Sequence, residues 1–162
     1  MRRPLAPVAA GLVLAAGLLG AGCAAIDAGR TAHPPLTKAE ADRLIAALVD
    51  DTLDAVAPGA PRTPGVHDGS RDECMDARGY NGTFSSTVAR QVAGLSDAAV
   101  AAAEQRVTRL WRDRGLIVSR YPGPPGVVDL QAAQRGIQYL ARISRPGHRV
   151  TASGTTPCLR PD

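Results

Sequence analysis

The chain has 162 residues and a formal net charge of +4, and only 3% of its residues are aromatic. So few aromatic rings leave little surface for stacking against bases, and we therefore expect no nucleic-acid partner. Once a leader is removed, about 140 residues remain, which fit one domain with a modest hydrophobic core.

An apolar run from Val8 to Leu19 follows Arg2 and Arg3 at the N-terminus. A positively charged start, a short apolar stretch and a small-residue end are typical of a secretory signal peptide. The run is shorter than the roughly 20 residues that a membrane-spanning helix needs. We therefore predict export, by either the general secretory or the twin-arginine route.

The segment Leu18-Leu19-Gly20-Ala21-Gly22-Cys23 ends this run. It resembles the lipobox of bacterial lipoproteins, although Gly20 stands where leucine is usual. The resemblance implies a signal peptide over residues 1–22, a lipid on Cys23 and attachment to the outer face of the cytoplasmic membrane. The alternative is an ordinary secreted protein with a free thiol at Cys23.

The chain contains three cysteines, an odd number for an exported protein. A lipid on Cys23 would leave Cys74 and Cys158 to form a disulfide, which is the usual fate of two cysteines outside the cytoplasm. Closing so long a loop contributes about 4 to 4.7 kcal/mol in the chain-entropy model. A catalytic or metal-binding thiol is the alternative, but neither a CxxC motif nor a neighbouring histidine supports it.

Residues 23–37 contain two adjacent prolines and no apolar periodicity, so we expect a flexible tether that leads into a single domain over residues 38–162. Thr37 and Glu40 have the spacing of a capping box, which predicts a helix that begins here and ends near Val56. Its apolar side chains recur at helical spacing. They are Leu44, Ile45, Leu48, Val49 and Leu53.

Residues 58–72 are rich in proline, glycine, arginine and aspartate, and they predict an irregular loop, whereas residues 79–82 predict a turn. From Thr83 to Val92 the pattern changes to period two, which is typical of a half-buried strand. One face of this strand carries Phe84, Val88 and Val92, and the other carries Thr83, Ser85, Thr87 and Gln91.

A second helix is expected between Ser96, as its N-cap, and Gly115, which ends it. Its only tryptophan lies on the apolar stripe, so we interpret this side chain as a core anchor rather than a platform for ligand stacking. The stripe consists of Val100, Ala103, Val107, Leu110 and Trp111.

Four short apolar runs follow, separated by breaks that contain glycine, and they predict an antiparallel meander. The runs are residues 116–119, 128–132, 137–143 and 149–153. Residues 121–126 are expected to connect two strands rather than to dock a partner. Together the elements predict an α+β fold of two layers, with an antiparallel sheet of about five strands and two helices packed on one face.

Part of this pattern resembles small lipoproteins of actinobacteria such as Streptomyces. The resemblance rests on the N-terminal anchor, on Leu110-Trp111 ahead of Gly115 and on the ending Gly154-Thr155-Thr156-Pro157-Cys158-Leu159. It implies an envelope-attached α+β domain with a disulfide. It brings no known reaction, so no catalytic residue is carried over.

The residues that could support catalysis or metal binding do not form a known motif. A nucleophile elbow of the Gly-x-Ser-x-Gly type is missing from the sequence. Three aspartates lack the alternating spacing of a calcium loop, so we interpret them as a solvated face: Asp50, Asp51 and Asp54. The histidines are dispersed and are expected to be exposed: His33, His67 and His148. We predict no catalytic residue, no metal and no cofactor.

Two further groups remain as weaker candidates. Asp129 could join a helix carboxylate as the acid pair of a glycoside hydrolase, but nothing in the sequence brings such a pair together. Arg142, Arg145 and Arg149 flank a Pro-Gly turn and could form a small anion-binding patch, although a soluble surface is the interpretation that we favour.

We therefore predict a lipid-anchored extracytoplasmic protein that is not an enzyme and has an accessory or protein-binding role. The alternative is a module that binds a small molecule or an envelope ligand on the exposed face of its sheet, and a hydrolase is third. An unfilled apolar pocket between sheet and helices would favour the ligand-binding module. A filled core and a polar sheet face would favour the accessory protein.

Overall fold

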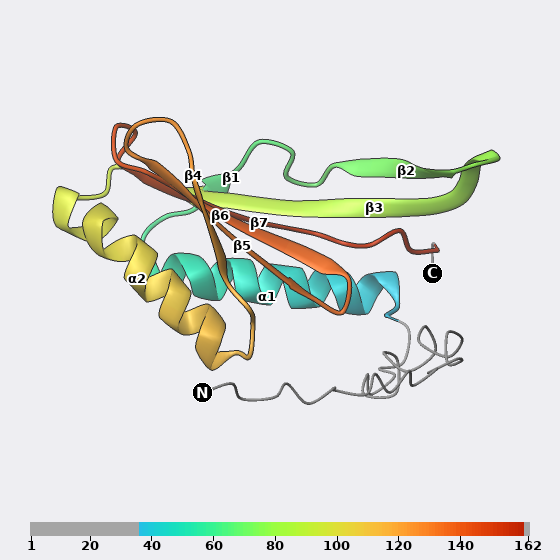
Figure 1. The fold of residues 1–162 in the computed structure, drawn as a ribbon, viewed down its shortest axis with the longest axis horizontal. Helices are drawn as coiled ribbons and strands as arrows, with labels where there is room; N and C mark the ends of the chain where they lie inside the picture. The colour runs from blue at the N-terminus through green and yellow to red at the C-terminus, as the bar shows by residue number, and fades with distance from the viewer. Residues whose placement is uncertain (1–35, 161–162) are drawn as a thin grey trace, which may run out of the picture. The chain divides into compact units, whose positions relative to one another are not determined.

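The structure, a computed structural model, describes residues 36–160. It has an α+β fold with two helices and an antiparallel sheet, as the sequence predicts (Figure 1). Its described part contains seven strands, so the expectation of about five was wrong. In chain order the elements are α1 (Lys38–Val56), β1 (Thr63–Pro64), β2 (Arg71–Asp76), β3 (Gly79–Val92), α2 (Asp97–Asp113), β4 (Ser119–Pro122), β5 (Val127–Gln134), β6 (Ile137–Ser144) and β7 (Arg149–Thr155).

Helix α1 begins and ends where the sequence predicts. The Thr37 hydroxyl accepts a hydrogen bond from the backbone N–H of Glu40 at 3.1 Å, which satisfies one of the free donors of the first turn. The Glu40 carboxylate does not complete the capping box, because it forms an ion pair with Arg135. Leu44 was expected on the buried stripe but is 39% exposed, so the stripe is narrower than predicted.

Helix α2 also has the predicted ends. Ser96 caps its N-terminus by accepting from Ala99 N–H at 3.2 Å. At its C-terminus Gly115 adopts a φ of +77°, a conformation that glycine reaches without a Cβ clash. Gly115 N–H donates to Arg112 C=O and Leu116 N–H donates to Trp111 C=O, both at 2.9 Å, which is the Schellman arrangement.

This helix end explains why β4 lies later than expected. The sequence predicts a strand over residues 116–119, but Leu116 is buried as the apolar residue that closes the Schellman motif. Ile117, the next residue, is 86% exposed. The strand therefore begins only at Ser119 and includes Tyr121 and Pro122 from the predicted connecting segment.

Strands β1 and β2 replace part of the loop predicted over residues 58–72, and both pair with β3. Every side chain in these two strands is exposed except that of Cys74. A strand that buries almost nothing shows no apolar alternation, so its sequence cannot be distinguished from a loop. Backbone pairing, rather than side-chain burial, holds this edge of the sheet.

The turn predicted over residues 79–82 lies inside β3. The chain instead reverses at Ala77 and Arg78, where the Asp76 carboxylate accepts from Arg78 N–H at 2.7 Å. The turn signal marks a bulge, because residues 81–83 of β3 all lie opposite Cys74 of β2. The Asn81 side chain closes the bulge by accepting from Thr83 N–H at 3.0 Å.

The sheet has the strand order β1-β3-β7-β6-β5-β4, with β2 paired to the far part of β3. The predicted meander over the last four strands is confirmed, and β7 then pairs with β3. Helix α1 contacts β3, β6 and β7, and α2 contacts β5, β6 and β7.

The core lies between the helices and the strands that they contact. Trp111 is 1% exposed, which confirms its predicted role, and its ring lies 6.4 Å from that of Tyr139. Helix α1 approaches β7 so closely that a Cβ on Gly154 would lie 2.5 Å from a methyl carbon of Ile45. This strand therefore needs glycine at the contact.

Candidate functional site

The side of the sheet that points away from the buried core carries many polar side chains, and we call it the open face. Alternate residues of β6 are buried toward the helices, from Ile137 to Ile143, so the residues between them must point the other way. Registered pairs continue this surface across β7 and β3. Its central side chains are Thr87, Gln91, Leu140, Arg142, Thr151, Ser153 and Thr155.

A groove of about 630 Å³ crosses the open face. Its floor combines short hydroxyl and amide side chains with Ala89 and Leu140, which lie opposite Ser153 on the two flanking strands. Thr87 and Thr155 lie opposite each other and their hydroxyls are 3.0 Å apart. Arg142 and Arg149 line one side, and residues 66–72 provide Val66, His67, Ser70 and Asp72.

The wall formed by residues 66–72 arises from an irregular edge of the sheet. Gly65 N–H donates to Ala89 C=O at 2.8 Å, and Gly69 N–H donates to Thr87 C=O at 2.9 Å, so the chain leaves β3 between these two points. The Asp68 carboxylate spans the gap by accepting from Ala89 N–H at 2.8 Å. His67 lies in the segment that leaves β3, and its φ of +68° is outside the range of regular strands.

Arg142 is held in place by a carboxylate of the neighbouring strand. Asp129 lies directly opposite it in the β5–β6 register. The Arg142 Nε and Nη2 atoms donate to the two Asp129 oxygens at 2.8 and 2.7 Å, a bidentate geometry that fixes the guanidinium plane. These hydrogen bonds to Asp129 raise the pKa of Arg142. Asp129 does not meet a helix carboxylate, since its partner lies on the open face.

The three arginines around the Pro146-Gly147 turn, which the sequence offered as a weaker candidate for an anion-binding patch, come together only in part. Arg142 and Arg149 both line the groove. Arg145 instead lies beside the β4–β5 connection, where its backbone N–H donates to Gly126 C=O at 2.9 Å. In the described residues Arg149 has no carboxylate partner, so its charge is available to a ligand.

The histidines do not converge. His33 lies outside the described residues, while His67 and His148 are exposed, as expected. His148 is in the β6–β7 turn, with Nδ1 3.1 Å from Leu95 C=O. His67, Ser70 and Asp72 line the same groove, but among the described residues no side-chain hydrogen bond joins them. A nucleophilic triad needs such bonds to orient its base.

The three aspartates at the end of α1 are ion-paired rather than simply solvated. Arg62 pairs with Asp50 and Asp54, and its hydrogen bond keeps the pKa of Asp54 below the usual value. Asp51 pairs with Arg114 of α2. Within residues 36–160, no group of three or more histidine, cysteine, aspartate or glutamate side chains is arranged to hold a metal ion.

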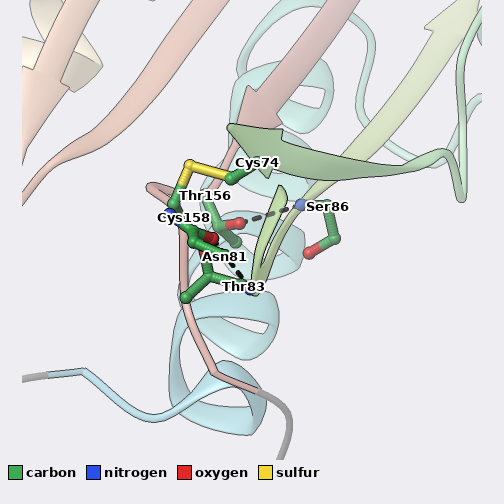
Figure 2. Close-up of a disulfide and its surroundings, with 6 residues drawn as sticks. All are labelled: Cys74, Asn81, Thr83, Ser86, Thr156 and Cys158. Atoms are coloured by element: carbon green, nitrogen blue, oxygen red, sulfur yellow. Dashed lines mark hydrogen bonds between the residues drawn. A yellow bond between two sulfur atoms is a disulfide. The ribbon is translucent and has the colours of Figure 1, made fainter. Parts of the chain in front are cut away.

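Cys74 and Cys158 form a disulfide, as the cysteine count predicts (Figure 2). It joins β2 to the C-terminal segment, which pairs with β3 through two hydrogen bonds between Phe84 and Leu159. The Thr156 hydroxyl adds a bond by accepting from Ser86 N–H at 2.9 Å. Cys23 lies outside the described residues, so its lipidation stays a prediction.

The sequence assigned Thr87 and Gln91 to the polar side of their strand, but it did not identify them as part of a site. What it lacked was the pairing of β3 with β7, which places Thr151, Ser153 and Thr155 beside them. The alternation of polar and apolar residues predicted the polar side of β3. The sequence did not show that β3 and β7 are neighbours in the sheet, because a helix and three strands separate them along the chain.

Comparisons with known proteins show a shared fold. No protein-family model and no curated protein matches the chain. A structure of LppA from Mycobacterium tuberculosis, described as a lipoprotein, is similar with a TM-score of 0.49 and 16% identity, over 75% of this chain and 76% of that one. A DUF4853 family protein from Actinomyces odontolyticus is similar with a TM-score of 0.51 and 11% identity, over 78% of this chain and 71% of that one. At such low identity, the second likeness shows that the α+β fold occurs in another protein.

Proposed function

We propose that this chain is a lipid-anchored extracytoplasmic protein without catalytic activity, and that it binds a partner protein through the open face of its sheet. The groove on that face is the observation that carries the proposal. The proposal treats the helices and the sheet as two layers with the core between them, so that the other side of the sheet presents the polar face.

The composition of the groove suits a protein partner. Its floor belongs to three hydrogen-bonded strands, β3, β7 and β6, so the floor side chains are held by rigid elements. The Arg142 guanidinium is already oriented by Asp129, which lowers the entropy lost when it binds a carboxylate or a backbone carbonyl. Arginine is enriched at protein interfaces for this planar, multiple-donor geometry.

Two observations support a role without catalysis. Apolar side chains from both helices and from β5, β6 and β7 fill the space between helices and sheet as one buried cluster. In the groove itself, the candidate base His67 lies on the exposed segment that leaves β3 rather than beside an oriented carboxylate. A general base acts best when a neighbouring group orients it, and none of the described side chains bonds to His67.

A small polar ligand is the second candidate. The groove volume of about 630 Å³ lies within the 300 to 1,000 Å³ range typical of small-molecule sites. Such sites are mostly apolar, whereas this groove mixes the apolar side chains of Val66, Ala89 and Leu140 with hydroxyl, amide and guanidinium groups. We therefore favour the protein partner.

The anchor rests on the sequence. A signal-like N-terminus, a lipobox-like segment ending at Cys23 and a disulfide that uses the other two cysteines are consistent with a lipid on the remaining one. Among the described residues, no helix is both long enough and apolar enough to cross a membrane. Residues 23–37 would then link the lipid to the domain.

Capture from solubilised envelopes tests the binding face. The wild-type protein would be compared with Ser153→Arg, which places a long charged side chain on the groove floor, and with Gln105→Arg on the exposed surface of α2. We expect partner proteins to be recovered with the wild type and with Gln105→Arg, and to be lost with Ser153→Arg. Equal recovery by all three proteins would contradict the assignment of the open face.

A further inference from the structure

The charges on the two helices are balanced differently. Every acidic side chain of α1 has a cationic partner, namely Glu40 with Arg135, Asp42 with Lys38, Asp50 with Arg62 and Arg90, Asp51 with Arg114 and Asp54 with Arg62. In α2, by contrast, Arg106, Arg109 and Arg112 have no carboxylate partner among the described residues. Arg43 of α1 is exposed and also has no carboxylate partner among the described residues, but the group of three unpaired arginines lies on α2.

The three arginines share one side of the helix because they are spaced by three residues. All three are exposed. Arg106 donates to the C=O of Val56 at 3.0 Å, which holds its guanidinium at the C-terminal end of α1 without neutralising its charge. Arg109 and Arg112 line a shallow hollow of about 540 Å³ on the surface of α2. We call Arg106, Arg109 and Arg112 the basic strip.

The acids near the basic strip do not cancel it. Glu104 is bonded to Arg120 at 2.6 Å, so that pair is neutral. Asp113 is the remaining exposed carboxylate at this end of the helix. The strip and Asp113 together leave a net charge of +2, since three arginines face one aspartate. The hollow is lined by polar side chains and one alanine, which suits contact with charged headgroups rather than insertion into acyl chains.

The position of α2 puts the strip within reach of an anchor at Cys23. The two helices are antiparallel, because Val56 meets Arg106 whereas Asp51 meets Arg114. Helix α1 begins directly after residues 24–37, a segment that cannot span more than about 50 Å. A lipid on Cys23 would therefore hold the domain close enough for the basic strip to reach the bilayer.

We propose that the basic strip of α2 rests on the anionic headgroups of the membrane and turns the open face outward. This orientation builds on the lipid anchor of the proposed function, but the attraction itself does not require the lipid. An arginine near an anionic surface strengthens binding about five-fold. Tethering keeps the strip at a high local concentration beside the bilayer, so a modest attraction is enough to orient the domain.

Vesicle binding tests the attraction in the absence of the lipid. The chain from Ala24 to Asp162 keeps the whole buried cluster, which lies between Ala41 and Leu159. Its binding would be measured in low-salt buffer on vesicles of phosphatidylglycerol and phosphatidylcholine in equal parts, and on phosphatidylcholine alone. We expect binding to the anionic vesicles only. The double variant Arg109→Gln and Arg112→Gln should weaken it roughly 30-fold.

The matched control removes the same charge elsewhere. Arg78, in the β2–β3 turn, and Arg145, in the β6–β7 turn, are exposed, so Arg78→Gln with Arg145→Gln should weaken binding much less. Equal loss of binding in both double variants would mean that net charge alone attracts the vesicles. No binding by the wild-type protein would mean that the strip binds an acidic protein instead of a membrane. Either result overturns the proposal. Fatty-acid labelling of Cys23 in cells tests the anchor separately.

Discussion

The contact between Thr52 and Trp111 shows how a single residue joins the two helices. The Trp111 indole N–H donates to the Thr52 hydroxyl at 2.8 Å, and that hydroxyl donates to Leu48 C=O at 2.6 Å. Thr52 is fully buried. A buried indole N–H without its acceptor costs about 1 to 3 kcal/mol. We therefore expect Thr52→Val to lower the free energy of unfolding by that amount, as measured by urea denaturation.

Thr108→Val is the matched control on α2, because Thr108 is only partly buried and forms no side-chain hydrogen bond among the described residues. Its effect should stay within about 0.5 kcal/mol. Equal effects of the two substitutions would show that the indole bond contributes nothing beyond the β-branched shape that threonine and valine share.

Asp42 makes the stability of the fold depend on acid pH. Burial raises the pKa of this carboxyl, but hydrogen bonds from Lys38 and Ser86 outweigh burial and bring it below its usual value of 3.8. A carboxyl with a lowered pKa stabilises the fold above its unfolded value, and this contribution is lost as pH falls through the folded pKa. We expect Asp42→Asn to reduce the loss of unfolding free energy between about pH 5 and pH 3.

The exposed Asp113, which forms no ion pair among the described residues, provides the comparison as Asp113→Asn. The prediction fails if Asp42→Asn retains the full acid-induced loss of stability seen in the wild type.

At the scale of single elements, the disulfide is the main covalent support of the long hairpin formed by β2 and β3. It closes a loop with a sequence separation of 84 residues. Removing a native disulfide from a small secreted domain typically costs about 2 to 5 kcal/mol. The double variant Cys74→Ser and Cys158→Ser should lose stability in this range while keeping the helical circular dichroism of α1 and α2. A loss below 1 kcal/mol would show that the strand pairing alone holds the hairpin.

Elements that bury an apolar stripe could be predicted from the sequence, and elements held by backbone pairing could not. Caps at Thr37 and Ser96 and the glycine after α2 fixed the helix ends, because these residues act locally. Strands β1 and β2 bury only Cys74 and left no periodic signal. The Asn81 bulge was mistaken for a turn because the same residue types permit both conformations.

At the scale of the whole molecule, the described domain has two unlike sides. The helical side carries the basic strip on α2, and the open face carries hydroxyls, an amide, apolar side chains and an oriented arginine. The sequence predicted the polar alternation of β3 but not the site, because β3 and β7 are brought together by a pairing across 57 or more residues of intervening chain. Strand order of this kind is set by packing against the helices, which has no local signature.

In-cell photocrosslinking tests the binding face most directly. A photocrosslinking side chain would replace Ser153 on the groove floor or, as the matched control, Gln105 on α2. We expect a discrete crosslinked protein from position 153 and none from position 105, where α2 faces the membrane. Discrete protein products from position 105 with none from position 153 would contradict the account.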